Sequence, residues 1–546
     1  VGVEDNFFEL GGDSILSIQV IARAVRGGVQ LTPLQLFERQ TIAELALVAG
    51  SGTIVQAEQD IVTGEVPLTP IQRWFFELNL LDPHHFNQAV LFDVSRLVKP
   101  NLLKQALQQL MLHHDALRLR FHRNRGTWRQ THASPGEEIS FSRIDLSSLP
   151  ESQHKTTIES MAQELQASLD LSAGPLMRVV VFEFNSAKPN RMLMIIHHLI
   201  VDGVSWRILL QDLTTAYQQL SHGERVTLPS KTNSFRQWAD RLSQHAGSVE
   251  LKRELDHWIK LADVKIDPLP VDFVTDARND VASSRHACVS LNSEETQALL
   301  RDVPGTYHTQ INDVLLTALL GAFARWTGKS SMLFDLEAHG REPIFPDMDL
   351  SRTVGWFTTM FPVLLNVNDV TDPGERLKTI KEQLRSIPNH GIGFGVLRYL
   401  CHEEETQRTM RTLPCPQVSF NYLGQFGRVN SDSTVQETRE SSGEVSSPRN
   451  DRDHLLEING SITDNRLQFT WTYNKIHYQS STIESLAESF LAEIRILIAH
   501  CQSAEAKGYT PSDFAKARVT QQDLDKLLGK VKRGTTKNVP HNDGRH

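Results

Sequence analysis

MLMIIHHLIVDGVSW, from Met192 to Trp206, is the stretch of sequence that decides the fold of most of this chain. Its first five residues form a short continuous apolar run, which is typical of a strand buried on both faces. The loop 197–203 follows, and Ser205 is suited to cap the helix that comes next. A histidine pair on such a loop can meet a substrate while the sheet holds it rigid. The alternative is a structural pair with one ring satisfied in the core.

The bulk composition limits the classes of protein. The chain has 546 residues, 40% of them apolar and 22% charged, which is ordinary for globular protein of two to four compact units. Its net charge of −9 argues against a nucleic-acid binder, which usually has a basic face. No apolar run approaches the roughly 20 residues that cross a bilayer, so we expect no membrane association.

The cysteines and the first residues suggest a compartment and a context. The chain begins with Val1 and shows no charged-then-apolar leader, so we expect an excerpt of a longer polypeptide. The scattered cysteines form no CxxC pair and no metal-ligand spacing, which predicts free thiols in a reducing cytoplasm and no metal site. These cysteines are Cys288, Cys401, Cys415 and Cys501.

Changes in composition divide the chain. Residues 1–50 show helical spacing of apolar residues and end in a turn-rich linker at 51–65. From 66 to about 525, helices alternate with short β-rich runs, the pattern of a mixed α/β protein. Within it, 428–453 is polar and should be an exposed loop. Residues 526–546 have little apolar content, which predicts a C-terminal tail or linker there.

The string DNFFELGGDSI, from Asp5 to Ile15, places Ser14 after two glycines and at the start of a helix. The glycines allow a sharp turn, and a helix N-terminus stabilises a phosphate through its free N–H groups and dipole. A phosphodiester on Ser14 is therefore physically favourable. The alternative from the residues alone is a simple N-cap, which is common.

The same string resembles the phosphopantetheine attachment motif of peptidyl carrier proteins. The resemblance implies 4'-phosphopantetheine on Ser14, added by a phosphopantetheinyl transferase. Asp13 stands where many carriers have His, and this form resembles carriers that precede epimerization domains. The match covers about residues 1–50, which predicts a small all-helical carrier domain that lacks its first helix.

The larger region resembles the condensation superfamily of nonribosomal peptide synthetases. HHLIVDG matches its HHxxxDG signature, and the VSWRIL that follows is typical of epimerization domains. Ala338 replaces the usual Gly in one motif, LEAHGRE. The resemblance implies a two-lobed, chloramphenicol-acetyltransferase-like α/β fold with lobes at about 66–240 and 265–525. Further matching strings are PLTPIQRWFF (67–76), HHDALRLRF (113–121, assigned to the scaffold), LEAHGRE (336–342), TVGWFTTMFP (353–362), PNHGIGFG (388–395) and VSFNYLGQF (418–426).

By this resemblance, His198 and Glu337 are the catalytic residues. Glu337 follows an apolar run, so desolvation should raise its carboxyl pKa toward neutrality and suit it to proton transfer. The alternative is a salt-bridged surface carboxylate. No third ligand accompanies the histidine pair of this loop, so a metal is not expected there.

Other motif residues receive supporting roles. Asn421, Tyr422 and His197 could orient a thioester or stabilise its oxygen charge, although the first two could simply pack a strand edge. Asp202 and Arg341 are interpreted as structural, each with a charge to pair inside the site.

The function implied is epimerization, from L to D, of the α-carbon of an aminoacyl or peptidyl thioester. An upstream adenylation domain and a downstream condensation domain of the same assembly line would be its partners. The alternatives are a condensation domain that joins two carrier-bound groups and a non-catalytic docking scaffold. A pyridoxal-phosphate racemase would need a Schiff-base Lys and a phosphate cup, and no such motif is found.

Overall fold

The structure, a computed structural model, describes residues 57–185, 189–368, 370–425, 435–438 and 440–503. In the N-terminal unit it describes 1–8, 10, 12, 16–17, 20–21, 23–24, 27–32, 35–36 and 39–50, and near the C-terminus 506, 508–514, 519–524 and 526. Ser14 and the tail predicted at 526–546, apart from residue 526, lie outside the described residues. No helix in the described part is long and apolar enough to cross a membrane.

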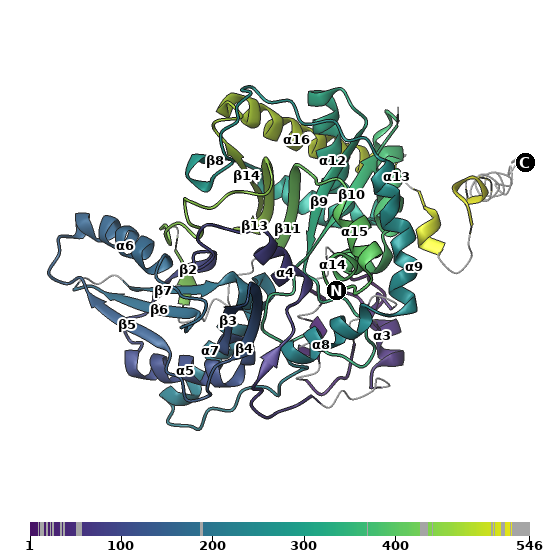
Figure 1. Ribbon diagram of the computed structural model, residues 1–546. Coiled ribbons are helices and arrows are strands. Elements are labelled where there is room, and N and C mark those ends of the chain that lie inside the picture. The colour runs from purple at the N-terminus through teal and green to yellow at the C-terminus, as the bar shows by residue number, and fades with distance from the viewer. Residues whose placement is uncertain are drawn as a thin grey trace, which may run out of the picture.

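The N-terminal unit has a small core of its own. Phe8, Ile21 and Leu36 are buried together. Helix α3 (Ile42–Val48) begins after Thr41, whose hydroxyl accepts a hydrogen bond from the Glu44 N–H at 3.2 Å. A side-chain cap of this kind satisfies one of the free donors of the first turn. This unit is seen at the right of Figure 1.

The first lobe is built on a five-stranded sheet of order β12-β2-β7-β6-β5, seen in the lower left of Figure 1. Only the β5–β6 pair is parallel. A smaller sheet of order β1-β4-β3 packs beside it. The elements are β1 (Glu65–Val66), α4 (Pro70–Glu77), β2 (Asn87–Val94), α5 (Pro100–His113), η1 (Asp115–Arg118), β3 (Leu119–Asn124), β4 (Thr127–His132), β5 (Ser140–Asp145), α6 (Glu151–Gln166), β6 (Met177–Glu183), β7 (Asn190–His197), η2 (His198–Ile200) and α7 (Gly203–Ser221).

The predicted buried strand is confirmed as β7, and both of its faces are covered. Leu193 and Ile195 pack into a core beneath α6, whereas Met192, Met194 and Ile196 point into the main core with α5 and α7. Because successive strand residues alternate between faces, a strand covered on both sides must be apolar at every position. The helix after the loop is also confirmed, but its N-cap is Asp202 and not Ser205, because the Asp202 carboxylate accepts from the Ser205 N–H at 2.7 Å.

The described end of the predicted linker packs firmly on the first lobe. Val62 is only 3% exposed, and its N–H donates to the Asp115 carboxylate at 3.3 Å. The Arg118 guanidinium donates to the Val62 carbonyl at 3.0 Å. Residues from about 62 onward are therefore part of the folded lobe and do not act as a free tether.

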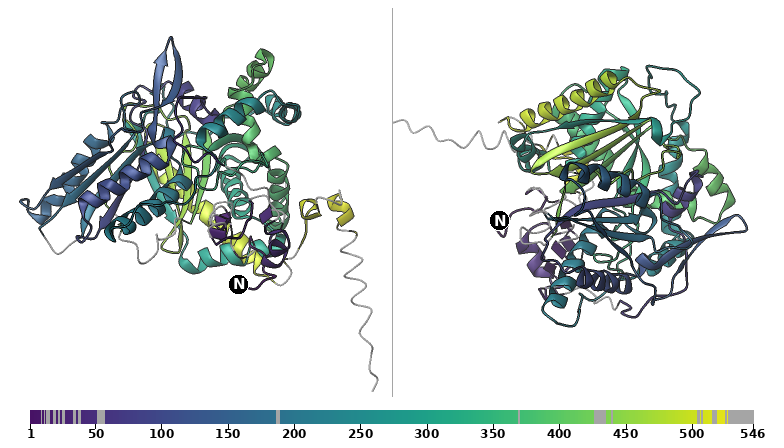
Figure 2. Two further views of the ribbon diagram at one scale, coloured as in Figure 1. Left: turned by 90° about the horizontal axis from the view of Figure 1, so that it is seen from below. Right: turned by 90° about the vertical axis from the view of Figure 1, so that its left-hand side faces the viewer.

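The second lobe holds a six-stranded sheet of order β10-β9-β11-β13-β14-β8. Helices α12 and α16 cover one of its faces, at the top of Figure 1, and α16, yellow-green, lies along the upper edge in the right-hand view of Figure 2. Helices α8 (Phe235–His245) and α9 (Val249–Trp258), with η3 (Ile259–Asp263), connect the lobes. The remaining elements are η4 (Val281–Ser283), β8 (Ser284–Ser290), α10 (Ser293–Arg301), α11 (Pro304–Tyr307), α12 (Ile311–Thr327), β9 (Ser331–Ala338), β10 (Thr359–Asn366), α13 (Pro373–Arg385), η5 (Pro388–Gly391), α14 (Ile392–Tyr399), α15 (Glu404–Arg411), β11 (Val418–Gln425), β12 (Val435–Glu437), β13 (Leu456–Thr463), β14 (Arg466–Asn474), α16 (Ser480–Cys501) and η6 (Pro511–Phe514).

The chain crosses back from the second lobe to the first. Strand β12 pairs antiparallel with β2, with Val435 opposite Val94. The prediction of an exposed loop over 428–453 is therefore wrong for this strand, and it is also wrong for Ser447 and Asn450, which are buried. A free edge of β2 offers backbone hydrogen bonds to any segment that reaches it, whatever the polarity of its side chains.

Candidate functional site

The candidate site lies between the lobes, and His198 enters it from the end of β7. The His198 backbone N–H donates to the Phe86 carbonyl at 2.9 Å, and its Nδ1 lies 2.9 Å from the Val201 carbonyl. The imidazole stacks on Phe86, with ring centroids 5.6 Å apart, and meets Trp356 at a tilt, with ring centroids 4.3 Å apart. Burial lowers the pKa of His198, which favours the neutral imidazole near pH 7.

His197 does not face the site, so its predicted contact with substrate is wrong. The side chain is fully buried, its Nε2 lies 2.9 Å from the Pro83 carbonyl, and its Nδ1 accepts from the Leu199 N–H at 3.2 Å. Burial also lowers its pKa to about 3. The physical reason is the strand itself, because adjacent residues at the end of β7 point to opposite sides.

Glu337 enters the site from β9 of the second lobe. Burial raises the pKa of its carboxyl to about 7, as expected from the apolar strand. The Asn421 side-chain amide donates to Glu337 Oε2 at 2.9 Å, since β11 runs parallel to β9 with Phe420 opposite Leu336. The structure thus brings Glu337 and Asn421 together.

Ala338 follows Glu337 on β9, and Tyr422 follows Asn421 on β11. Ala338, which departs from the family pattern, is a regular β9 residue paired with Thr359, a conformation open to any residue. Tyr422 follows Asn421 at the point where β11 loses its regular register with β13, and it packs against the main core.

Asp202 and Arg341 form a buried ion pair that joins the lobes. The Arg341 guanidinium lies 3.0 Å from both carboxylate oxygens of Asp202, and both residues are 4% exposed. Arg341 also donates to the Thr353 carbonyl at 2.7 Å, while Asp202 accepts from the Phe357 N–H at 3.1 Å. These bonds hold the segment that carries Trp356 against His198.

The same segment connects His198 with Glu337. Trp356 contacts the His198 ring, and Met360, four residues later, pairs with Glu337 across β9 and β10. A cavity of about 400 Å³ opens along this segment and is lined by Trp356, Met360 and Asp335. Asp335 precedes Glu337 by two residues and so lies on the same face of β9. The cavity therefore lies beside neighbours of both catalytic candidates: Trp356, which contacts His198, and Met360, which pairs with Glu337.

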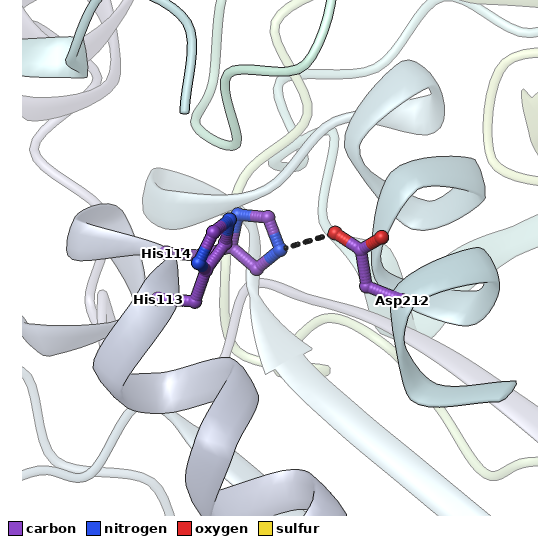
Figure 3. A group of neighbouring side chains, drawn as sticks. All are labelled: His113, His114 and Asp212. Carbon is purple, nitrogen blue, oxygen red and sulfur yellow. Dashed lines mark hydrogen bonds and ion pairs between the residues drawn. The ribbon is translucent and has the colours of Figure 1, made fainter. Parts of the chain in front are cut away.

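A second cluster, of His113, His114 and Asp212, has ligand atoms within 4.8 Å of one another (Figure 3). Such spacing could suit a metal ion. However, Asp212 already accepts from His114 at 3.0 Å and from the Arg352 guanidinium at 2.5 Å. A second cation would meet the positive charge of Arg352, which favours the scaffold interpretation of this histidine pair.

The phosphopantetheine site can be tested only through its described neighbours, because Ser14 lies outside the described residues. The Gly12 N–H donates to the Phe7 carbonyl at 2.9 Å, and a Cβ on Gly12 would lie 2.5 Å from the Phe7 ring. Helical residues 16–17 follow. A tight turn at Gly12 and helical residues at 16–17, on either side of the attachment site, are consistent with the attachment of a phosphate group there.

Sequence reasoning missed part of the surroundings of His198. Gln88 contacts the imidazole from β2, Phe86 contacts it from the residue just before β2, and Trp356 contacts it from the other lobe. No local pattern marks Gln88. Trp356 lies in the TVGWFTTMFP string, and this match was the only sequence signal that could have pointed to its contact with His198.

Family models match nearly the whole chain. The model of the condensation domain matches residues 62–520, and that of the phosphopantetheine attachment site matches residues 1–48. A linear gramicidin synthase polypeptide of Brevibacillus parabrevis is 47% identical over 97% of this chain and 10% of its own length. Chondramide synthase of Chondromyces crocatus is 44% identical over 97% of this chain and 13% of its own length. The chain thus spans about a tenth of the length of these relatives.

Solved structures share the two-lobed fold. The epimerization domain from the third module of tyrocidine synthetase B is 38% identical, with a TM-score of 0.76 over 82% of this chain and 99% of that domain. The condensation domain of the Monacolin K polyketide synthase superposes with a TM-score of 0.63 over 82% of this chain and 99% of that one, at 18% identity, which shows the fold alone.

Proposed function

Because the chain belongs to the condensation-domain family of nonribosomal peptide synthetases, we propose that its larger region inverts the α-carbon of an aminoacyl or peptidyl thioester. The acyl group is carried on Ser14 of the attachment domain. 4'-Phosphopantetheine supplies there a flexible arm whose thiol holds the acyl group as a thioester. The similarity to a solved epimerization domain supports this choice within the family.

The observation that carries the proposal is the state of Glu337. A carboxyl with a pKa of about 7 can both accept and return a proton near neutral pH. Asn421 holds Oε2, whereas Oε1 has no hydrogen-bond partner among the described residues. One oxygen is therefore oriented by the protein and the other is available to a substrate.

Inversion requires a proton to leave one face of the α-carbon and another to arrive at the opposite face. Glu337 comes from β9 of the second lobe and His198 from η2 of the first, an arrangement that would let them act on a substrate between the lobes from two sides. The α-proton of a thioester is acidic because the developing charge spreads to the carbonyl oxygen. Glu337 acts on one face, and His198 acts on the other as a base or as a stabiliser of that charge.

The test uses the whole chain loaded with an α-deuterated L-aminoacyl group and no acceptor. We expect loss of deuterium and a mixture of both configurations, because inversion at one carbon has an equilibrium constant near unity. Glu337→Gln should slow the loss by about 10²–10⁴-fold, the usual contribution of a general base. Glu404→Gln on α15, which removes an exposed carboxyl, is the matched control.

The outcomes separate the candidates. Undiminished deuterium loss in Glu337→Gln would remove this residue from the mechanism. A condensation domain would leave the loaded L residue unchanged in the absence of an acceptor, and a docking scaffold would do so with or without one. Release of pure D product would contradict a simple two-sided proton transfer.

A further inference from the structure

Gln88 connects the first strand of the lobe with the catalytic candidate His198. It is the second residue of β2 and pairs with Ile196 of β7, two residues before His198. Its side-chain Oε1 accepts a hydrogen bond from the Trp206 indole N–H at 2.7 Å, and its Nε2 lies 3.1 Å from His198 Nε2. The amide therefore lies between an indole and an imidazole, one at each end.

The chemistry of these groups determines which atoms carry protons. An indole N–H can only donate, so the Gln88 oxygen must face Trp206 and the amide NH₂ must face His198. Because an amide NH₂ also only donates, His198 Nε2 must offer its lone pair. On the other side of the ring, the Val201 carbonyl can only accept, so Nδ1 carries the hydrogen.

These constraints oppose a second proton on His198. A hydrogen on Nε2 would point at the Gln88 NH₂. Rotating the amide would turn that NH₂ toward the Trp206 N–H, so one clash would replace the other. Asp202 is the charged group whose field favours the protonated ring, and Arg341 already pairs with its carboxylate, while burial lowers the pKa of His197 and keeps it neutral.

We propose that Gln88 is a positioning residue that, oriented by Trp206, holds His198 as the neutral tautomer with a fixed, unprotonated Nε2. This inference rests on the proposed function, in which His198 takes part in proton transfer. The Gln88 NH₂ occupies the Nε2 lone pair, so the ring can accept a substrate proton only after this hydrogen bond has opened. Until then His198 is a neutral group and not an imidazolium.

The direct test is the titration of His198 in the full chain, followed by NMR of ¹⁵N-labelled histidine and assigned with a His198→Ala variant. Gln88→Glu places a carboxylate that accepts from both Trp206 and a protonated His198. We expect its midpoint to rise by about one to three pH units. Trp206→Phe frees the amide to turn and should raise the midpoint by a smaller amount. Gln468→Glu, the same change at an exposed position of β14, should leave it unchanged.

A second readout separates positioning from simple stability. Gln88→Leu should lower kcat for deuterium loss with little change in KM. In Gln88→Glu the acid limb of the pH–rate profile should move to higher pH together with the NMR midpoint. Titration of His198 at the wild-type midpoint in both Gln88→Glu and Trp206→Phe would overturn the inference. Because the NMR midpoint does not depend on turnover, this result is distinct from failure of the Glu337→Gln test, which concerns the proposed function itself.

Discussion

Replacing Asp202 with Ala should separate the cost of a lost helix cap from the cost of an orphaned charge. Asp202 caps α7 through the Ser205 N–H and neutralises Arg341, which is 4% exposed. The lost cap costs about 1 kcal/mol. The unpaired buried guanidinium costs about 3–5 kcal/mol more, because no water can replace the carboxylate. We therefore expect a total loss of about 4–6 kcal/mol.

Asp372→Ala is the matched control. Asp372 caps α13 in the same way, with the Glu375 N–H at 2.9 Å, but it is exposed and faces no buried charge. Its loss should cost about 1 kcal/mol. For a protein of this size, 1 kcal/mol shifts Tm by about 1 °C, so calorimetry should show about 4–6 °C for Asp202→Ala and about 1 °C for the control.

A double variant tests whether the unpaired Arg341 charge causes most of the loss. Asp202→Asn with Arg341→Met keeps a capping oxygen and removes both charges, so it should recover most of the lost stability. Equal Tm shifts in Asp202→Ala and Asp372→Ala would refute the reasoning, because the buried ion pair would then contribute nothing. A double variant as unstable as Asp202→Ala would refute it as well.

Four further substitutions have expected outcomes. The unfolded carboxyl of Glu337 loses its proton near pH 4.5 but the folded one near pH 7, so stability falls as pH rises between these values; the Tm advantage of Glu337→Gln should grow from pH 5 to pH 7 and then level off. A Cβ on Gly321 of α12 would lie 2.7 Å from the buried Glu493 carboxylate, so Gly321→Ala should cost about 1–3 kcal/mol by denaturant unfolding. Gly305→Ala, which meets nothing within 4 Å, should stabilise slightly in the same assay. Leu209→Ala, at a fully buried position of α7, should cost about 2–5 kcal/mol, seen as a lower denaturation midpoint.

Local patterns predicted the framework of the site well. The continuous apolar run at 192–196 predicted β7, because a strand covered on both faces has no polar position. The apolar residues before Glu337 predicted a raised carboxyl pKa for the same reason of desolvation. The distinction between His197 and His198 was also available, since two adjacent residues at a strand end cannot both face the site.

The family motifs also predicted which residues far apart in the chain belong to the same site. Matching strings predicted that His198, Glu337 and Asn421 share one site, although no local rule relates positions more than eighty residues apart. The sequence indicated that Asp202 and Arg341 would each pair with an opposite charge, but not which residue each would pair with. The structure makes them partners of each other, 3.0 Å apart.

The sequence by itself determined the α/β class, the strand–loop–helix that carries His198, and the polarity around Glu337, because these depend on periodicity within about twenty residues. Only the tertiary structure decided that Gln88 meets His198, that β12 returns to the first lobe, and that residues near Val62 are part of the core. Such contacts depend on which strand edges and cavities the rest of the chain leaves open. They are settled by the free energy of the whole core and not by the residues on either side of them.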